Sequence, residues 1–176
     1  LRRLDLSFNR LCGVKYDMVS GWQGEYSCLG FDALADALSI TTSLTRLELN
    51  NNSMGADCKE LLSAGLFDAP RGQLAHMRVD EWDLSEGSKR LNTSKSDVGI
   101  ADANLIAALL MRNRELQSLR LDLADLPVRE LRGDEEHCPT AIDLSKKELR
   151  CEDALVIGRL LAKKSSCTTL DLHENG

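Results

Sequence analysis

Six cysteines and three histidines are the residues of this 176-residue chain best suited to bind a transition metal or to act as nucleophiles. The cysteines are spread along the chain, at Cys12, Cys28, Cys58, Cys138, Cys151 and Cys167. No two of them form a CxxC pair, and no histidine lies at zinc-finger spacing from any of them. His137 and Cys138 are adjacent, but two ligands are too few for a structural metal. We therefore predict no metal site.

The dispersed cysteines favour reduced, mostly buried thiols in an intracellular protein. Cys28, Ile100 and Cys151 occupy equivalent places in three segments that align, which indicates that cysteine serves there as a small core side chain. The alternative is a disulfide between Cys12 and Cys28, which lie in neighbouring predicted turns. We predict that all six cysteines are reduced.

Catalytic motifs are absent from the sequence. It contains no glycine-rich phosphate loop, no GxSxG and no HExxH. His76 and His173 fall in predicted strands, where a surface histidine is more often a contact residue than a base. We predict that the chain is not an enzyme, with no catalytic residue and no cofactor.

Composition and charge limit the kinds of partner that the chain is expected to bind. The formal net charge is −6, and no run of lysine and arginine is present, so binding to nucleic-acid phosphates is not expected. No apolar run approaches the roughly 20 residues that span a bilayer. The first and last residues both fall inside a repeat, so we expect the chain to be a fragment of a longer array.

A leucine pattern, LxxLxLxxNxL, recurs along the chain. Its copies begin at residues 1, 44, 74, 116, 139 and 167, with fainter copies at 16 and 88. Asn9, Asn52 and Asn175 fill the asparagine place. An asparagine amide there can bond to backbone groups of neighbouring turns, so these three residues predict an incomplete ladder of such bonds. Irregular structure is expected where Trp82 or Lys147 replaces asparagine.

Helical spacing appears in three segments that align without gaps, 31–38, 103–110 and 154–161. Apolar residues recur in each at i, i+3, i+4 and i+7, which is typical of one buried helix face. Small residues at Ala35, Ala107 and Gly158 would allow close packing on a sheet. The predicted helices are 31–40, 56–66, 101–112 and 152–163. The predicted strands are 3–6, 46–49, 76–79, 118–121, 141–144 and 169–172.

The leucine pattern followed by an Ala/Leu-rich helix, in units of about 28 residues, resembles the ribonuclease-inhibitor-like class of leucine-rich repeats. That class includes the repeat domains of NOD-like receptors and of Ran GTPase-activating protein. The DLS motifs at 5–11 and 143–149 are also similar to protist repeat proteins of unassigned function. The resemblance implies an α/β fold, a single horseshoe-shaped leucine-rich repeat solenoid over residues 1–176. It would have a parallel sheet on its concave face and helices on its convex face.

Three stretches depart from the repeat, at 12–28, 84–96 and 126–139. The first contains both tyrosines and one of the two tryptophans. These aromatic residues could form a binding loop, since such side chains are enriched at binding hot spots. Alternatively, Trp22 and Tyr26 fill the space left by a missing helix, and we favour this second interpretation.

The repeat pattern predicts which side chains point from the strands to the concave surface. These candidate protein-binding residues are Arg3, Asp5, Arg46, Glu48, His76, Arg78, Arg90, Arg120, Asp143 and Asp171. Arg3, Arg46 and Arg90 share one column, and we expect them to meet acidic groups of a partner, because charge sets specificity and association rate. The other interpretation is that acids of the chain neutralise them.

These features predict a non-catalytic, cytoplasmic protein-binding module, either a recognition domain or a scaffold subunit of a larger assembly. Another protein is the expected partner. One alternative is a regulator of an enzyme, such as a GTPase activator of the Ran-directed kind. Another is the ectodomain of an extracellular receptor. Asn51 and Asn92 begin tripeptides of the N-glycosylation pattern, which matter only in a secreted protein.

Overall fold

The computed structural model of the chain describes residues 1–69, 73–96, 98–133, 139–162 and 167–175. These residues form eleven short strands and five helices. The helices are α1 (Leu29–Ile40), α2 (Ala56–Asp68), α3 (Ile100–Leu110), α4 (Val128–Arg132) and α5 (Cys151–Leu161). The strands are β1 (Arg3–Asp5), β2 (Lys15–Asp17), β3 (Gly21–Gln23), β4 (Arg46–Glu48), β5 (His76–Arg78), β6 (Asp83–Leu84), β7 (Arg90–Asn92), β8 (Ser118–Arg120), β9 (Asp125–Pro127), β10 (Ala141–Asp143) and β11 (Thr169–Asp171).

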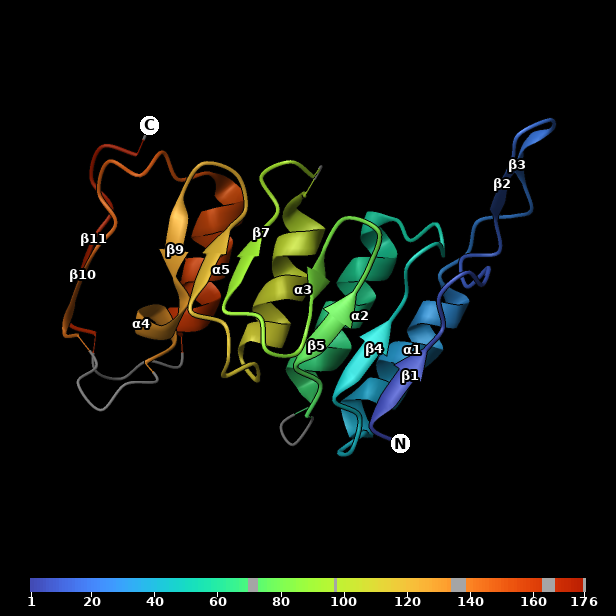
Figure 1. Cartoon of the computed structure of the whole chain (residues 1–176), viewed down its shortest axis with the longest axis horizontal. Coiled ribbons are helices and arrows are strands. Elements are labelled where there is room, and N and C mark those ends of the chain that lie inside the picture. Colours follow the sequence, from blue (N-terminus) through green and yellow to red (C-terminus); the bar gives the residue numbers. More distant parts are fainter. Residues whose placement is uncertain (70–72, 97, 134–138, 163–166, 176) are drawn as a thin grey trace.

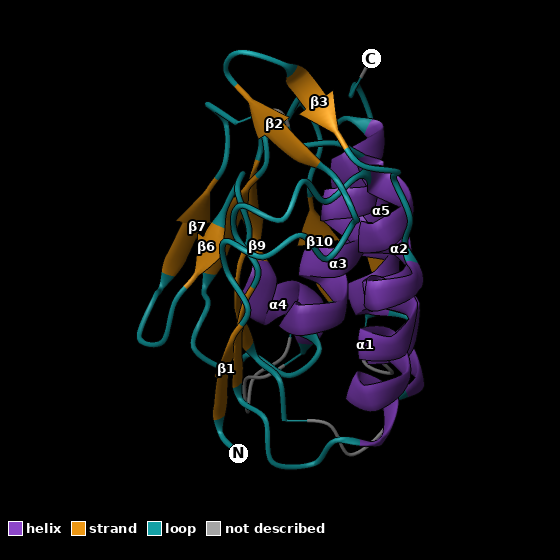
Figure 2. Cartoon of the chain, turned by 90° about the vertical axis from the view of Figure 1, so that its right-hand side faces the viewer, coloured by secondary structure: helices purple, strands orange, loops and turns teal. Residues whose placement is uncertain are grey.

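Helices and strands lie in two layers. Helices α1, α2, α3 and α5 stand side by side behind the strands in Figure 1, and each packs against the next in that order. The view turned by 90° separates most strands from the helices (Figure 2). The predicted positions of six strands and four helices are confirmed to within a few residues.

The predicted solenoid lined by one parallel sheet is wrong. The described strands form four small separate sheets, ordered β1-β4-β5-β6, β7-β8-β9, β2-β3 and β10-β11. Three strand pairs are antiparallel, namely β2–β3, β5–β6 and β8–β9, whereas the other four pairs are parallel. The chain is therefore a mixed α/β protein with several short sheets.

Tight hairpins explain why no continuous sheet forms. After β5 the chain turns back, with Val79 N donating to Trp82 O at 3.0 Å, and β6 pairs antiparallel with β5. Strand β6 thereby occupies the edge of β5 that the next parallel strand would need, so β7 begins a new sheet. Strand β9 covers β8 in the same way. Both turns fall where Trp82 and Ala124 replace the asparagine of the pattern.

The faint repeat predicted from residue 16 is also wrong. Residues 15–23 form the antiparallel β2–β3 hairpin, and β4 pairs directly with β1. Figure 1 shows this hairpin, in blue, projecting from the body at one end of the molecule.

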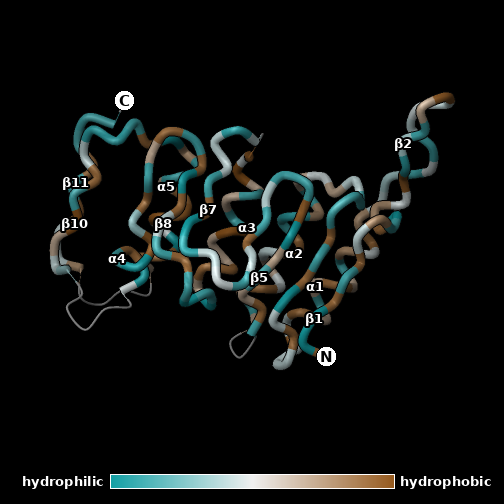
Figure 3. The backbone as a smooth tube through the Cα atoms, in the orientation of Figure 1, coloured by the Kyte–Doolittle hydropathy of each residue, from teal (hydrophilic) through white to brown (hydrophobic). Residues whose placement is uncertain are grey.

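The core lies between the two layers. The central strand residues Leu47, Met77, Leu119 and Ile142 are at most 3% exposed. Helix α3 is buried almost all round because it lies between α2 and α5. The predicted inward positions of α3 are all buried, but Gly158 of α5 is exposed, so that prediction is wrong. Hydropathy colouring shows apolar residues in the helices and at the end of the β2–β3 hairpin (Figure 3).

The asparagine bonds between turns are confirmed for Asn52 and Asn175, whereas Asn9 bonds only within its own turn. Asn52 donates from Nδ2 to Leu6 O and Leu49 O, both at 2.8 Å, and so joins its own turn to the preceding one. Asn175 does the same for Leu144 O and Leu172 O, at 2.9 and 2.7 Å. Such bonds supply side-chain donors to the backbone carbonyls of successive turns.

A buried ion pair joins α2 to α3. Lys59 Nζ lies 2.8 Å from Asp102 Oδ1 and 2.9 Å from Glu81 Oε1. Trp82 Nε1 donates to Asp102 Oδ1 at 2.9 Å. The tryptophan in the asparagine place is thus 4% exposed and pairs with a buried carboxylate. Among the described helices, none has the length and apolar character needed to span a bilayer.

Candidate functional site

The β2–β3 hairpin has an apolar end that solvent surrounds. Met18 is 95% and Val19 is 97% exposed, and Trp22 is 65% exposed. The exposure of Trp22 shows that the gap-filling interpretation of this residue is wrong. Exposed apolar side chains gathered at one protruding point are typical of an interaction site.

The turn of this hairpin is held in one conformation. Asp17 Oδ1 accepts hydrogen bonds from Val19 N, Ser20 N and Ser20 Oγ at 2.8–2.9 Å. Gly21 follows at φ +72°, a conformation that side chains disfavour. Tyr16 and Trp22 pack edge to face across the strands, with ring centroids 5.4 Å apart. The hairpin therefore presents Met18 and Val19 on a fixed turn.

Two glycines shape the base of the hairpin. Gly13 and Gly24 have φ of +76° and +97°. A Cβ on Gly24 would lie 2.2 Å from Gly13 O, so the two chain segments cross too closely for any other residue. This crossing brings Cys12 and Tyr26 back toward the body of the protein.

Two hollows flank the hairpin. One, of about 420 Å³, is lined by Val14, Trp22, Gly24, Tyr26 and Ser53. The second, of about 440 Å³, is lined by residues of the hairpin and of the turns after β1, β4 and β5. Val14, Trp22 and Ser53 line both, so the two hollows adjoin at these residues and offer space for a partner's side chains.

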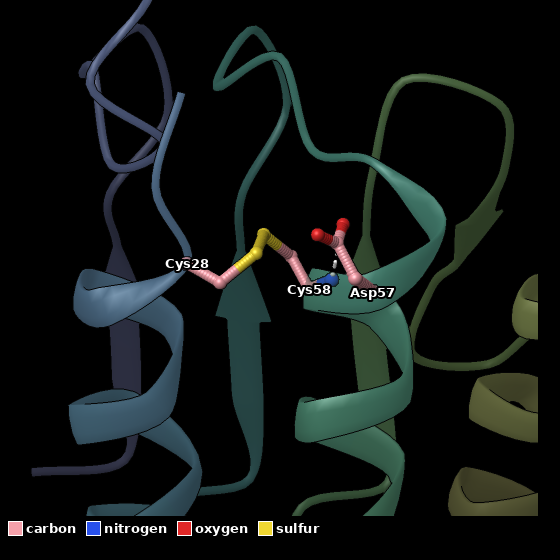
Figure 4. Close-up of side chains that lie close together, drawn as sticks. All are labelled: Cys28, Asp57 and Cys58. Carbon is pink, nitrogen blue, oxygen red and sulfur yellow. Dashed lines mark hydrogen bonds between the residues drawn. A yellow bond between two sulfur atoms is a disulfide. The ribbon is translucent and has the colours of Figure 1, made fainter. Parts of the chain in front are cut away.

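A cluster of sulfur atoms lies beneath the hairpin. Cys28 and Cys58 form a disulfide that joins the start of α1 to the start of α2 (Figure 4). The free thiol of Cys12 lies 3.4 Å from Cys58 Sγ. We call Cys12, Cys28 and Cys58 the three-sulfur cluster. The prediction of six reduced cysteines is wrong, and the disulfide differs from the Cys12–Cys28 alternative.

Tyr26 joins the three-sulfur cluster to Asp57. Its hydroxyl donates to Asp57 Oδ1 at 2.5 Å and lies 3.2 Å from Cys58 Sγ and 3.6 Å from Cys28 Sγ. Burial, followed by the hydrogen bond to Asp57, raises the pKa of Tyr26 well above its usual value of 10.0. A Cβ on Gly55 would lie 2.4 Å from this hydroxyl, so glycine at the N-cap of α2 makes room for it.

Cys28, Asp57 and Cys58 are close enough to share a metal ion, since their ligand atoms lie within 4.8 Å of one another. The two sulfurs are bonded to each other, however, and thiolates are the form that binds metals. The Tyr26 hydroxyl also contacts all three candidate ligands. This arrangement fits sulfur chemistry better than metal binding. His137 and Cys138 lie outside the described residues.

Of the predicted basic column, Arg3 and Arg46 are in register with His76 on β1, β4 and β5. Arg90 lies on β7 in a separate sheet, so the prediction that it shares this column is wrong. Glu48 accepts hydrogen bonds from both Arg3 and Arg46, and the bond from Arg46 is 3.0 Å. The hydrogen bond from Arg46 is the main reason that the pKa of Glu48 lies below its usual value. Asp83 of β6 lies 3.4 Å from Arg46.

Further acids pair with the remaining basic residues. Arg78 lies 4.0 Å from Asp83, and Arg90 lies 3.4 Å from Asp125 of β9. Arg120 donates to Asp122 O at 2.9 Å. The contact of Arg120 is with a backbone carbonyl, whereas carboxylates of the chain itself contact Arg78 and Arg90, as they do Arg3 and Arg46. This is the arrangement expected of a largely neutralised surface. The antiparallel strands β6 and β9 that supply Asp83 and Asp125 were not predicted.

Three aspartates of the predicted surface have a local structural role. Asp5, Asp143 and Asp171 each accept a hydrogen bond from the backbone N two residues later, at 2.8–3.0 Å. Bonds from the following serines lower the pKa values of Asp5 and Asp143. These residues stabilise the turn after each strand, as Asx turns do.

Sequence reasoning missed the hairpin end and the Cys28–Cys58 pair. The signals were present, since Met18 and Val19 stand between Asp17 and the glycines Gly21 and Gly24. The cysteine pairing had no such signal, because two helix starts 30 residues apart meet only through tertiary packing.

Comparisons with family models, with curated proteins and with solved structures found no match. The resemblance to leucine-rich repeats therefore rests on the sequence pattern alone.

Proposed function

We propose that this chain is a non-catalytic protein-binding module whose main contact element is the β2–β3 hairpin. The observation that carries this proposal is the near-complete exposure of Met18 and Val19, at 95% and 97%, on a turn fixed by Asp17. Because the turn already fixes the backbone, a partner that buries these residues orders little beyond their side chains. The partner is a protein that offers an apolar recess to this end.

The two hollows beside Trp22 add specificity to this contact. A partner that encloses the hairpin end would also meet Trp22, and tryptophan is among the residues that dominate binding energy. Lys15 and Asp80 line the second hollow and supply charges of both signs at its rim. Nucleic acid is not the proposed partner, because the chain carries a net charge of −6.

The experiment compares capture by the wild-type protein with capture by the double variant Met18→Ser, Val19→Ser in extracts of the native cells. Ile40→Ser is the matched control, because Ile40 is also apolar and 81% exposed but lies at the end of α1. A partner kept by the control and lost by the double variant supports the proposal. Binding of the isolated partner should weaken at least about tenfold in the double variant. Equal affinity of all three proteins would rule out the hairpin.

The disulfide favours one of the alternatives over the cytoplasmic location. Disulfides such as Cys28–Cys58 persist in oxidising compartments. In addition, Asn51 and Asn92, which begin the two glycosylation tripeptides, are exposed. A binding domain of an extracellular or lumenal protein is therefore the second candidate. Acid quenching of native cells, followed by differential alkylation, measures the state of these two cysteines. If Cys28 and Cys58 are fully reduced in the cell, the result supports an intracellular binding module instead.

A further inference from the structure

The three-sulfur cluster places a free thiol against a disulfide. Cys12 Sγ lies 3.4 Å from Cys58 Sγ, and Cys58 is bonded to Cys28. Both Cys12 and Cys58 are 0% exposed, so no solvent molecule separates them. We propose that these residues form an internal thiol–disulfide exchange centre, in which the sulfur of Cys12 displaces Cys28 from Cys58.

The exchange is balanced without an outside oxidant. The thiolate of Cys12 attacks Cys58 Sγ, a Cys12–Cys58 bond forms, and the Cys28–Cys58 bond breaks. The electron pair of the broken bond leaves on Cys28 Sγ, which takes up the proton that Cys12 has lost. One disulfide and one thiol are present before and after the step.

Cys28 is well placed to leave as a thiolate. It is the N-cap residue of α1, a helix of 12 residues, and a helix N-terminus stabilises negative charge. The Tyr26 hydroxyl oxygen, 3.6 Å from Cys28 Sγ, is near enough to accept a hydrogen bond from the Cys28 thiol once the departed sulfur has taken up its proton. A leaving thiolate of lower pKa departs faster.

The Cys12 thiol is a weak nucleophile at neutral pH. Burial raises its pKa, while hydrogen bonds with the Gly55 backbone and with Tyr26 act in the opposite direction. The exchange should therefore be slow at neutral pH and faster as the pH rises. Its product is a free thiol at Cys28, which is only half-buried, in place of the fully buried thiol of Cys12.

The exchange also changes which end of the hairpin segment is anchored. Cys12 precedes the hairpin and Cys28 follows it, whereas Cys58 lies in the first turn of α2. The bond therefore moves from one end of this segment to the other. This inference does not depend on the proposed binding function.

The test uses the unreduced full chain and N-ethylmaleimide, with peptide mapping by mass spectrometry. In the wild-type protein we expect Cys28 to become labelled over time, together with a peptide that contains a Cys12–Cys58 bond. With excess reagent, the labelling rate should rise about tenfold per pH unit below the pKa of Cys12, because the thiolate is the attacking form. The rate should not depend on protein concentration.

Cys12→Ser is the decisive variant, since serine is similar in size and cannot form a disulfide. We expect Cys28 labelling to fall at least about tenfold in it, while Cys167→Ser, which removes a free thiol elsewhere, labels like wild type. Tyr26→Phe keeps the ring and should slow labelling several-fold. This variant also gives a result if Cys12→Ser does not fold. The proposal is overturned if Cys28 stays unlabelled in wild type, or labels equally fast in Cys12→Ser.

Discussion

Asp102 and Asp153 are two buried carboxylates whose different neighbours give them different effects on stability. Asp102 and Asp153 are the third residues of α3 and α5, and each accepts from the backbone N three residues earlier, Gly99 N or Arg150 N. Asp102 also contacts Lys59 and Trp82. Asp153 is 1% exposed, and within the described residues its Oδ1 has no hydrogen-bond partner. An ionised Asp153 is therefore expected to destabilise the fold, whereas Asp102 is needed by its partners.

Asp153→Asn should raise the free energy of unfolding near pH 7 by on the order of 1 kcal/mol. Burial is the main reason that the pKa of Asp153 lies above 3.8, so the folded state holds its proton more tightly than the unfolded state. Its stabilising contribution is present below 3.8 and is lost as the pH rises through the raised value. Urea titrations over this range should show the variant gaining on wild type as pH increases.

Asp102→Asn is the matched comparison, and it should lower stability by about 3 kcal/mol at pH 7, because it weakens the pairing of a buried lysine. Equal effects of the two substitutions would contradict this account.

The asparagine bonds give a second prediction at the residue scale. Asn52→Ala should lower the free energy of unfolding by about 1–3 kcal/mol, because Leu49 O loses its side-chain donor and Leu6 O keeps only the bond from Asn9. Asn9→Ala is the control, since Asn9 is exposed and bonds only within its own turn, so a loss of no more than about 0.5 kcal/mol is expected. Chemical denaturation midpoints measure both. An unchanged midpoint for Asn52→Ala would mean that water replaces the amide.

At the scale of elements, helix spacing depends on single positions. Gly65 of α2 faces α1, and a Cβ there would lie 2.5 Å from Ala35 O. Gly158 of α5 faces open space, with nothing within 4 Å of an added Cβ. Packing between helices therefore requires the first glycine, whereas nothing in the described structure requires the second.

Gly65→Ala and Gly158→Ala should change stability in opposite directions. Alanine gains roughly 1 kcal/mol over glycine in a helix interior. At residue 158 this gain should appear in full, whereas at residue 65 the contact with a backbone oxygen costs about 1–3 kcal/mol and outweighs it. Thermal denaturation of both variants tests this, and stabilisation by Gly65→Ala would show that α1 and α2 can separate at little cost.

At the scale of the whole molecule, the disulfide stabilises one end of the helix layer. It links α1 to α2 across a sequence separation of 30 residues. Closing a loop of that length stabilises a fold by about 3–4 kcal/mol through the unfolded state. The β2–β3 hairpin and the first two helices should therefore depend on the redox conditions more than α3 and α5 do.

Reduction of the wild-type protein should lower its free energy of unfolding by about 3–4 kcal/mol. Denaturation with and without a phosphine reductant measures this difference. The variant Cys28→Ala, Cys58→Ala is the control and should show no shift on adding reductant. A shift of similar size in that variant would show that the reductant destabilises the protein by some route other than the Cys28–Cys58 disulfide.

The sequence by itself determined the positions of most helices and strands, because apolar spacing depends only on which residues are adjacent along the chain. It also predicted the bonds of Asn52 and Asn175, because residues at the same place in a repeated pattern lie in neighbouring turns. Only the tertiary structure showed that β6 and β9 fold back on β5 and β8. Each then occupies the free edge of its neighbouring strand, so the sheet ends there. The tertiary structure was likewise needed to show the pairing of Cys28 with Cys58 and the acids that pair with Arg46 and Arg90. Contacts between distant residues depend on how elements pack, and periodicity along the chain carries no record of that packing.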